Sequence, residues 1–154
     1  MRQLDNIGNK LCEYQADLFE HSAKYTDCSS LVFVRQFMIS DIACRMDKGA
    51  FVFESLDLPA CLDELSKEKK LTQGKEKYPG YILRWIGYMY RYIAYTRNLP
   101  SRYLFLKVKT KKMYSLYEAY HSLDPEAAAI RILEICGIAD NDTSLRALAE
   151  KLLL

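Results

Sequence analysis

Residues 78–98, YPGYILRWIGYMYRYIAYTRN, decide the fold, because they predict a helix that is too apolar to lie on a surface. Pro79 suits the first turn of a helix, where its missing N–H needs no partner, and Pro100 follows Asn98 at the spacing of a helix stop. Other helices normally surround such a helix, so we expect it at the centre of an all-α domain. Its aromatic stripe holds Tyr81, Trp85, Tyr88, Tyr92 and Tyr95, a second apolar stripe holds Ile82, Ile86, Met89 and Ile93, and a narrow polar or small strip holds Arg84, Gly87, Arg91 and Asn98.

A membrane-spanning helix is the alternative interpretation of the same stretch. Arg84 and Arg91 interrupt it, and a charge in the middle of a membrane costs several kcal/mol. We therefore expect no membrane span. The N-terminus has no basic run followed by an apolar stretch, which favours a cytoplasmic location.

Length and composition predict one compact domain, 1–154, with about six to seven helices. A chain of 154 residues that is 50% hydrophobic can fill one core and is too short for two ordinary domains. We expect one helix over 31–47, and a final helix after Asp142. The charged stretch 66–77 is expected to be a mobile basic loop. The first helix is expected over 2–25, as a surface helix with an apolar seam of Leu4, Ile7, Leu11, Tyr14 and Leu18.

The clearest helix start is Asp124-Pro125-Glu126, which combines a capping carboxylate, proline at the first position and an acid near the positive end of the dipole. Two short helices are expected after the central one, capped by Ser101 and Thr110. The apolar positions of the helix after Asp124 are expected to be Ile130, Leu133 and Ile135.

Nothing in the sequence indicates catalysis, a metal site or a cofactor. The five cysteines stand singly without a CxxC pair, and no nucleotide-binding, zinc-protease or serine-hydrolase motif occurs. We therefore expect a protein that is not an enzyme; an enzyme would need a polar pocket around Arg91, His121 and Asp124. Arg91 itself is expected in a structural ion pair, because a buried guanidinium needs an acid. The candidate acids are Asp47, Glu118 and Asp124.

Positive charge and tyrosine concentrate in the same part of the chain. Residues 66–112 hold thirteen Lys and Arg against two Glu, although the net charge of the whole chain is only +2. Such a region either binds a partner or is a solvated face that balances the acidic remainder. For partner binding, the candidate residues are Arg102, Lys107, Lys109, Lys111, Lys112, Tyr103 and Tyr114.

DNA is the alternative partner for this region. The order of a helix, a short turn at 98–101 and a second short helix suggests a helix-turn-helix within 82–112. The second helix, RYLFLKV, is mostly apolar and offers few side chains that read bases. A transcriptional regulator is therefore our second hypothesis, and the sequence leaves the oligomeric state open.

Three segments carry a resemblance to a known family: FVRQFMISDIACRMD (33–47), GKEKYPGYILRWIGYMYRYIAYTRNLPS (74–101) and YHSLDPEAAAIRILE (120–134). They resemble small uncharacterised bacterial proteins that occur in toxin–antitoxin-like gene cassettes, beside a gene product similar to an ADP-ribosyltransferase toxin. The resemblance implies an antitoxin-like module that binds and neutralises a cognate toxin without catalysis of its own. It supplies no catalytic residues.

Overall fold

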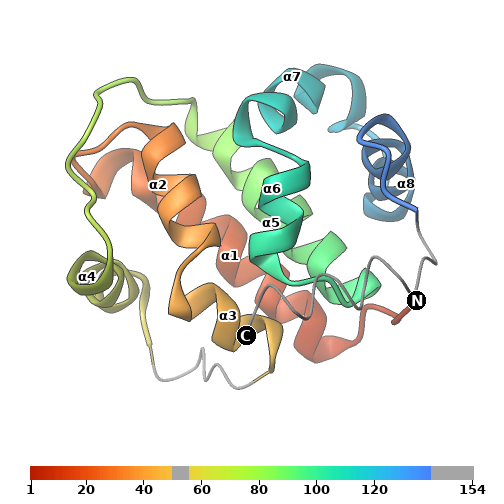
Figure 1. The fold of residues 1–154 in the computed structure, drawn as a ribbon, viewed down its shortest axis with the longest axis horizontal. Coiled ribbons are helices and arrows are strands. Elements are labelled where there is room, and N and C mark those ends of the chain that lie inside the picture. Colours follow the sequence, from red (N-terminus) through yellow and green to blue (C-terminus); the bar gives the residue numbers. More distant parts are fainter. Residues whose placement is uncertain (50–55, 140–154) are drawn as a thin grey trace.

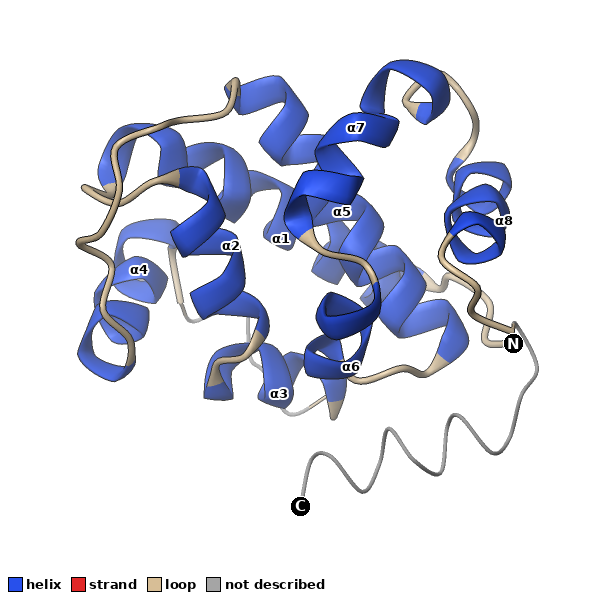
Figure 2. Cartoon of the chain, turned by 45° about the horizontal axis from the view of Figure 1, so that its top comes forward, coloured by secondary structure: helices blue, strands red, loops and turns tan. Residues whose placement is uncertain are grey.

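The central helix is α5 (Gly80–Arg97), one of eight helices in the computed structural model, which describes residues 1–49 and 56–139 (Figure 1). The described part contains helices and loops without a strand, as Figure 2 shows, so the predicted all-α class is confirmed. Its eight helices slightly exceed the expected number. The predicted final helix after Asp142 lies outside the described residues. The other helices are α1 (Asn6–Tyr25), α2 (Ser30–Met38), α3 (Asp41–Asp47), α4 (Leu58–Glu68), α6 (Ser101–Lys107), α7 (Thr110–Tyr120) and α8 (Pro125–Ile135).

α5 has the burial expected of a central helix. Thirteen of its 18 residues are buried, and it packs against α1, α6, α7 and α8. Asn98 ends the helix in the left-handed conformation, with φ of 54°, and Pro100 follows. None of the described helices is both long and apolar enough to cross a membrane.

α1 packs along α5 in the most extensive helix pair of the fold. The narrow polar strip of α5 is the face that meets α1: Arg84 binds carboxylates of α1, and Arg91 binds Gln15. At Gly87 the two backbones approach closely, since an added Cβ would lie 2.7 Å from the carbonyl oxygen of Gln15. α1 therefore buries one face, which includes Leu11 and Leu18, against the rest of the fold and exposes the other, and the expected apolar seam is wrong at Ile7, which is 61% exposed.

The single helix expected over 31–47 is two helices, α2 and α3. Ser40 separates them, because its Oγ accepts a hydrogen bond from the N–H of Ala43 at 3.1 Å and so starts a new helix. The carboxylate of Glu68, at the end of α4, also accepts from the N–H of Asp41, at 3.0 Å. A local cap and a tertiary contact together end the first helix.

The helices after α5 begin differently from their predicted caps. Ser101 and Thr110 are the first residues of α6 and α7 and not their caps. In α8 the predicted cap is correct, since Asp124 accepts from the N–H groups of Glu126 and Ala127. The predicted apolar positions of α8 are only partly right: Ala128, Ala129, Ile132 and Leu133 are buried, whereas Ile130 and Ile135 are 39% and 46% exposed.

The charged stretch 66–77 begins in the last turn of α4 and continues as an irregular segment along α2. Its backbone is bonded to the start of α2, because the N–H groups of Ser29 and Ser30 donate to the carbonyl oxygens of Gln73 and Glu76, each at 2.9 Å. The Nζ of Lys77 donates to the carbonyl oxygen of Thr26 at 2.7 Å. The predicted loop is therefore present from Lys69 onward and is mostly exposed, although Leu71 is buried, and its mobility stays a prediction.

Candidate partner-binding surface

Arg91 lies in a closed polar network inside the fold, and its acid is Asp47. The guanidinium is 1% exposed and donates to Asp47 Oδ1 at 2.6 Å, to Gln15 Oε1 at 2.9 Å and to Ser101 Oγ at 3.1 Å. Asp47 also accepts from the N–H and the Oγ of Ser101, at 2.8 and 2.6 Å. Gln15 Nε2 donates to the carbonyl oxygen of Gly87 at 2.9 Å. The network joins α1, α3, α5 and α6, and each donor and acceptor named here has its hydrogen-bond partner inside the network.

A second buried arginine, Arg97, was not singled out from the sequence. It is 1% exposed and binds both carboxylate oxygens of Glu126 at 2.7 and 2.8 Å. The hydroxyl of Tyr92 donates to the same carboxylate at 3.0 Å. From the sequence, Glu126 was recognised only as an acid at a helix start. The signal that could have predicted this pair was a second arginine inside the apolar helix together with that acid. The contact fixes α8 against α5.

The three residues of the possible enzyme site lie apart. Arg91 is enclosed with Asp47, whereas Asp124 caps α8. His121 is exposed, and its Nδ1 lies 2.8 Å from the carbonyl oxygen of Tyr117. No shared polar pocket therefore forms around these three side chains.

The cysteine thiols also lie in structural positions. All five cysteines are free, and Cys12, Cys28 and Cys61 are buried. Burial raises the pKa of Cys12 to about 12 and that of Cys61 to about 11, which keeps both thiols protonated at neutral pH. Within residues 1–49 and 56–139, His, Cys, Asp and Glu form no cluster that could hold a metal ion.

The structure exposes five of the predicted cations on α6, on α7 and between them. We call them the basic surface: Arg102, Lys107, Lys109, Lys111 and Lys112. None of the five forms an ion pair with another described residue, unlike Arg84, Arg91 and Arg97 on α5. The Nζ of Lys109 lies 4.8 Å from the ring centre of Phe105, and Lys107 lies 5.9 Å from that of Tyr103.

Apolar and aromatic groups accompany the basic surface. Leu106 of α6 is 49% exposed, and Tyr114 of α7 is 39% exposed. Tyr103, by contrast, is only 2% exposed, so its place among the predicted partner-binding residues needs correction. α6 turns Tyr103, Leu104 and Phe105 into the core, which leaves Leu106 and Lys107 to solvent.

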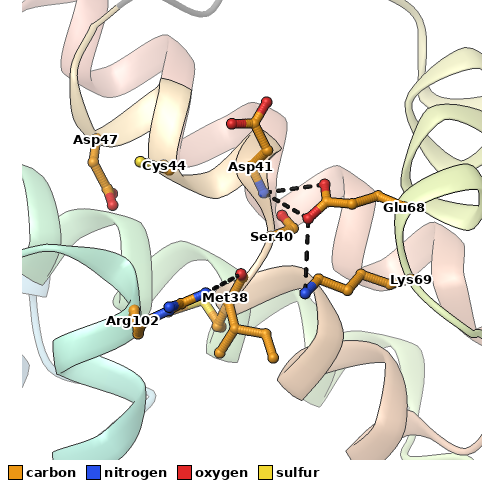
Figure 3. Close-up of a pocket in the computed structure, with 9 residues that line it drawn as sticks. Met38, Ser40, Asp41, Cys44, Asp47, Glu68, Lys69 and Arg102 are labelled. Carbon is orange, nitrogen blue, oxygen red and sulfur yellow. Dashed lines mark hydrogen bonds and ion pairs between the residues drawn. The ribbon is translucent and has the colours of Figure 1, made fainter. Parts of the chain in front are cut away.

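A cavity of about 240 Å³ opens beside Arg102, between α3, α6 and the end of α4 (Figure 3). Its charged groups serve the fold: Arg102 donates to the carbonyl oxygen of Ile39 at 2.9 Å, and Glu68 accepts from the N–H of Asp41. Lys69 lies 3.8 Å from Glu68. The cavity therefore lies between helix ends, and the charged groups named here already have partners within the fold.

The helix-turn-helix hypothesis is poorly matched by α6. In such motifs the N-terminal residues of the second helix contact base edges. Here the N–H of Ser101 is bonded to Asp47, and four of the seven residues of α6 are buried. The exposed side chains of α6 are only Arg102, Leu106 and Lys107. This arrangement suits contacts with phosphate or carboxylate groups better than base reading.

No protein-family model, curated protein or solved structure matches the chain. The resemblance to the toxin–antitoxin-like family therefore stays a prediction.

Proposed function

We propose that this protein is an antitoxin-like interaction module that binds an acidic surface of a partner protein through its basic surface and performs no catalysis of its own. The observation that carries the proposal is the difference between the cations of α5 and those of the basic surface. Arg84, Arg91 and Arg97 neutralise carboxylates within the fold, whereas the five cations of the basic surface have no ion-pair partner among the described residues. The four lysines of the basic surface are exposed to solvent, and Arg102, which is also exposed, donates one hydrogen bond to the carbonyl oxygen of Ile39.

The exposed Leu106 and Tyr114 add apolar contact area to the basic surface. Interfaces combine such groups with charges that steer association and select the partner. The resemblance found in the sequence supports a toxin as that partner, encoded beside this protein. The partner surface should carry carboxylates opposite Lys109, Lys111 and Lys112, with an apolar patch for Leu106.

The test is co-expression with the adjacent open reading frame, followed by affinity pull-down and a growth assay. Rescue of growth and a stable complex are expected. Reversing Lys109, Lys111 and Lys112 to Glu should leave the melting temperature unchanged and weaken the complex at least about tenfold, because like charges then oppose each other. The matched control reverses three exposed lysines elsewhere, Lys24, Lys48 and Lys75, and gives the same net charge.

Two results would overturn the proposal. An unchanged affinity in the triple reversal would move the interface away from the basic surface. A complex with duplex DNA whose affinity falls steeply with added salt, without binding to the neighbouring gene product, would favour the transcriptional regulator.

A further inference from the structure

An aromatic groove of about 250 Å³ lies between α1, α5 and α7, formed by residues other than those of the basic surface. The α5 side chains are the exposed end of the aromatic stripe noted in the sequence, and α7 supplies the opposite wall. Tyr81 is 61% exposed. The groove is smaller than the pockets that enclose drug-sized ligands, and its size suits one or two side chains of a protein. Its rings are Tyr81, Trp85, Tyr88, Tyr117 and His121, and its charged lining residues are Glu13 and Arg84.

Tyr117 connects the rings of the groove. Its ring centre lies 5.6 Å from that of Trp85, nearly perpendicular at 84°, and 5.8 Å from that of Tyr81. The ring of His121 stacks on that of Tyr117, with the ring centres 4.3 Å apart. These contacts hold the rings in place before any partner arrives, so little conformational entropy is lost on binding. Tyr81 is exposed, and Trp85, Tyr88 and Tyr117 are partly buried; Trp and Tyr in such positions are typical of binding hot spots.

Carboxylates dominate the charge at the α1 side of the groove. Arg84 is bound by Glu13 at 2.8 Å, by Asp17, and by Glu20 at 3.6 Å. One guanidinium against three carboxylates leaves an excess of two negative charges. Of these four charged groups only Glu13 and Arg84 line the groove, so the excess of negative charge comes from Asp17 and Glu20 of α1 beside it, and this edge of the groove has the opposite charge to the basic surface.

We infer that this aromatic groove binds a basic segment of a partner protein, with an arginine or lysine side chain lying on the rings. The faces of Trp and Tyr attract a cation, and the surplus carboxylates of α1 supply its counter-charge. An acidic segment would be repelled by the two carboxylates that Arg84 does not neutralise. This second binding site is independent of the basic surface in the proposed function, and the two surfaces select segments of opposite charge.

Trp85 makes the inference directly measurable, because it is the only tryptophan in the chain and lies in the groove. Its fluorescence would be titrated with three short peptides of equal length, in which arginine, serine or glutamate alternates with leucine. The arginine peptide should give a saturating change, and the serine and glutamate peptides should bind at least about tenfold more weakly. Equal or tighter binding of the glutamate peptide, or no saturation by any peptide at millimolar concentration, would overturn the inference.

Variants then locate the binding site. Tyr81→Ala should weaken the arginine peptide about fivefold to tenfold, because it removes one exposed ring. Tyr25→Ala is the matched control, since Tyr25 is 64% exposed on α1 but outside the groove. Glu13→Gln should weaken binding about threefold at low salt. A Tyr81→Ala variant that binds like Tyr25→Ala would contradict the site.

The triple reversal at Lys109, Lys111 and Lys112 separates this inference from the proposed function. That variant should lose the toxin complex and still bind the arginine peptide. If the arginine peptide does not bind but the toxin complex forms, only the inference about the groove is refuted. If the peptide binds but no toxin complex forms, only the proposed role of the basic surface is refuted.

Discussion

Replacing Arg91 by Leu tests the buried network that joins four helices. The change removes three donated hydrogen bonds and leaves the carboxylate of Asp47, whose side chain is 8% exposed, without its cation. Breaking a buried ion pair on one side costs about 3–5 kcal/mol. Because Ser101 still donates two bonds to Asp47, we expect the lower end, about 3 kcal/mol. For a domain of this size, that loss lowers the melting temperature by roughly 6–12 °C.

The assay is urea unfolding followed by circular dichroism, with Arg84→Leu as the matched control on the same helix. Arg84 also contacts carboxylates, but its side chain is 38% exposed, so its loss should cost about 1 kcal/mol or less. A double-mutant cycle of Arg91→Leu with Asp47→Asn should give a coupling energy of about 1–3 kcal/mol. If Arg91→Leu costs no more than Arg84→Leu, or the cycle is additive, the buried pair does not stabilise the fold as argued.

Three further predictions test other contacts of α5 and α1. Gly87→Ala should lower the free energy of unfolding by about 1–3 kcal/mol, because the new Cβ would lie 2.7 Å from a backbone oxygen of α1; Gly80→Ala, which meets only a side chain at 3.4 Å, is the control, and equal urea midpoints would contradict the close approach. Glu126→Gln should cost about 2 kcal/mol in the same assay, because the buried Arg97 loses the carboxylate that binds two of its nitrogens, and an unchanged midpoint would show that the pair adds nothing. The hydroxyl of Tyr95 and the backbone N–H of Gly8 donate hydrogen bonds to Asp5, and these bonds hold the pKa of Asp5 below its usual 3.8. Its folded pKa is thus below its unfolded one, so its contribution to stability is present above about pH 4 and is lost as the pH falls through the folded-state pKa; a carboxyl NMR titration with a midpoint at or above 3.8 would refute this.

The positions of most helices follow from local signals. The proline before α5, the asparagine and second proline after it, and the Asp124 cap of α8 act within a few residues of themselves. Such signals can be recognised in the sequence without knowing which other helices pack against the segment. The break between α2 and α3 was missed because Ser40 is an unremarkable residue within an apolar run, and Glu68 reaches it only in the folded chain.

Exposure was harder to predict than helix position. Tyr103 and Tyr114 both lie in the part of the chain rich in tyrosine and positive charge, yet the first is buried against the core and the second lies at the surface. Periodicity gives the angle of a side chain about its own helix axis, but not the side from which other helices approach. For the same reason Ile7 and Ile130 were expected to be buried and are exposed.

The sequence by itself determined an all-α protein around one aromatic helix, with an excess of positive charge in residues 66–112. Only the tertiary structure decided which of these cations pair with carboxylates inside the fold and which are exposed to solvent. Three arginines of α5 meet carboxylates of α1, α3 and α8, whereas the lysines around α6 and α7 keep no such partner among the described residues. It also placed the tyrosine-rich groove beside the acids of α1 and apart from those lysines. Charge and helix periodicity are properties of the chain read in one dimension, but the partner of each buried charge depends on contacts between residues far apart in sequence.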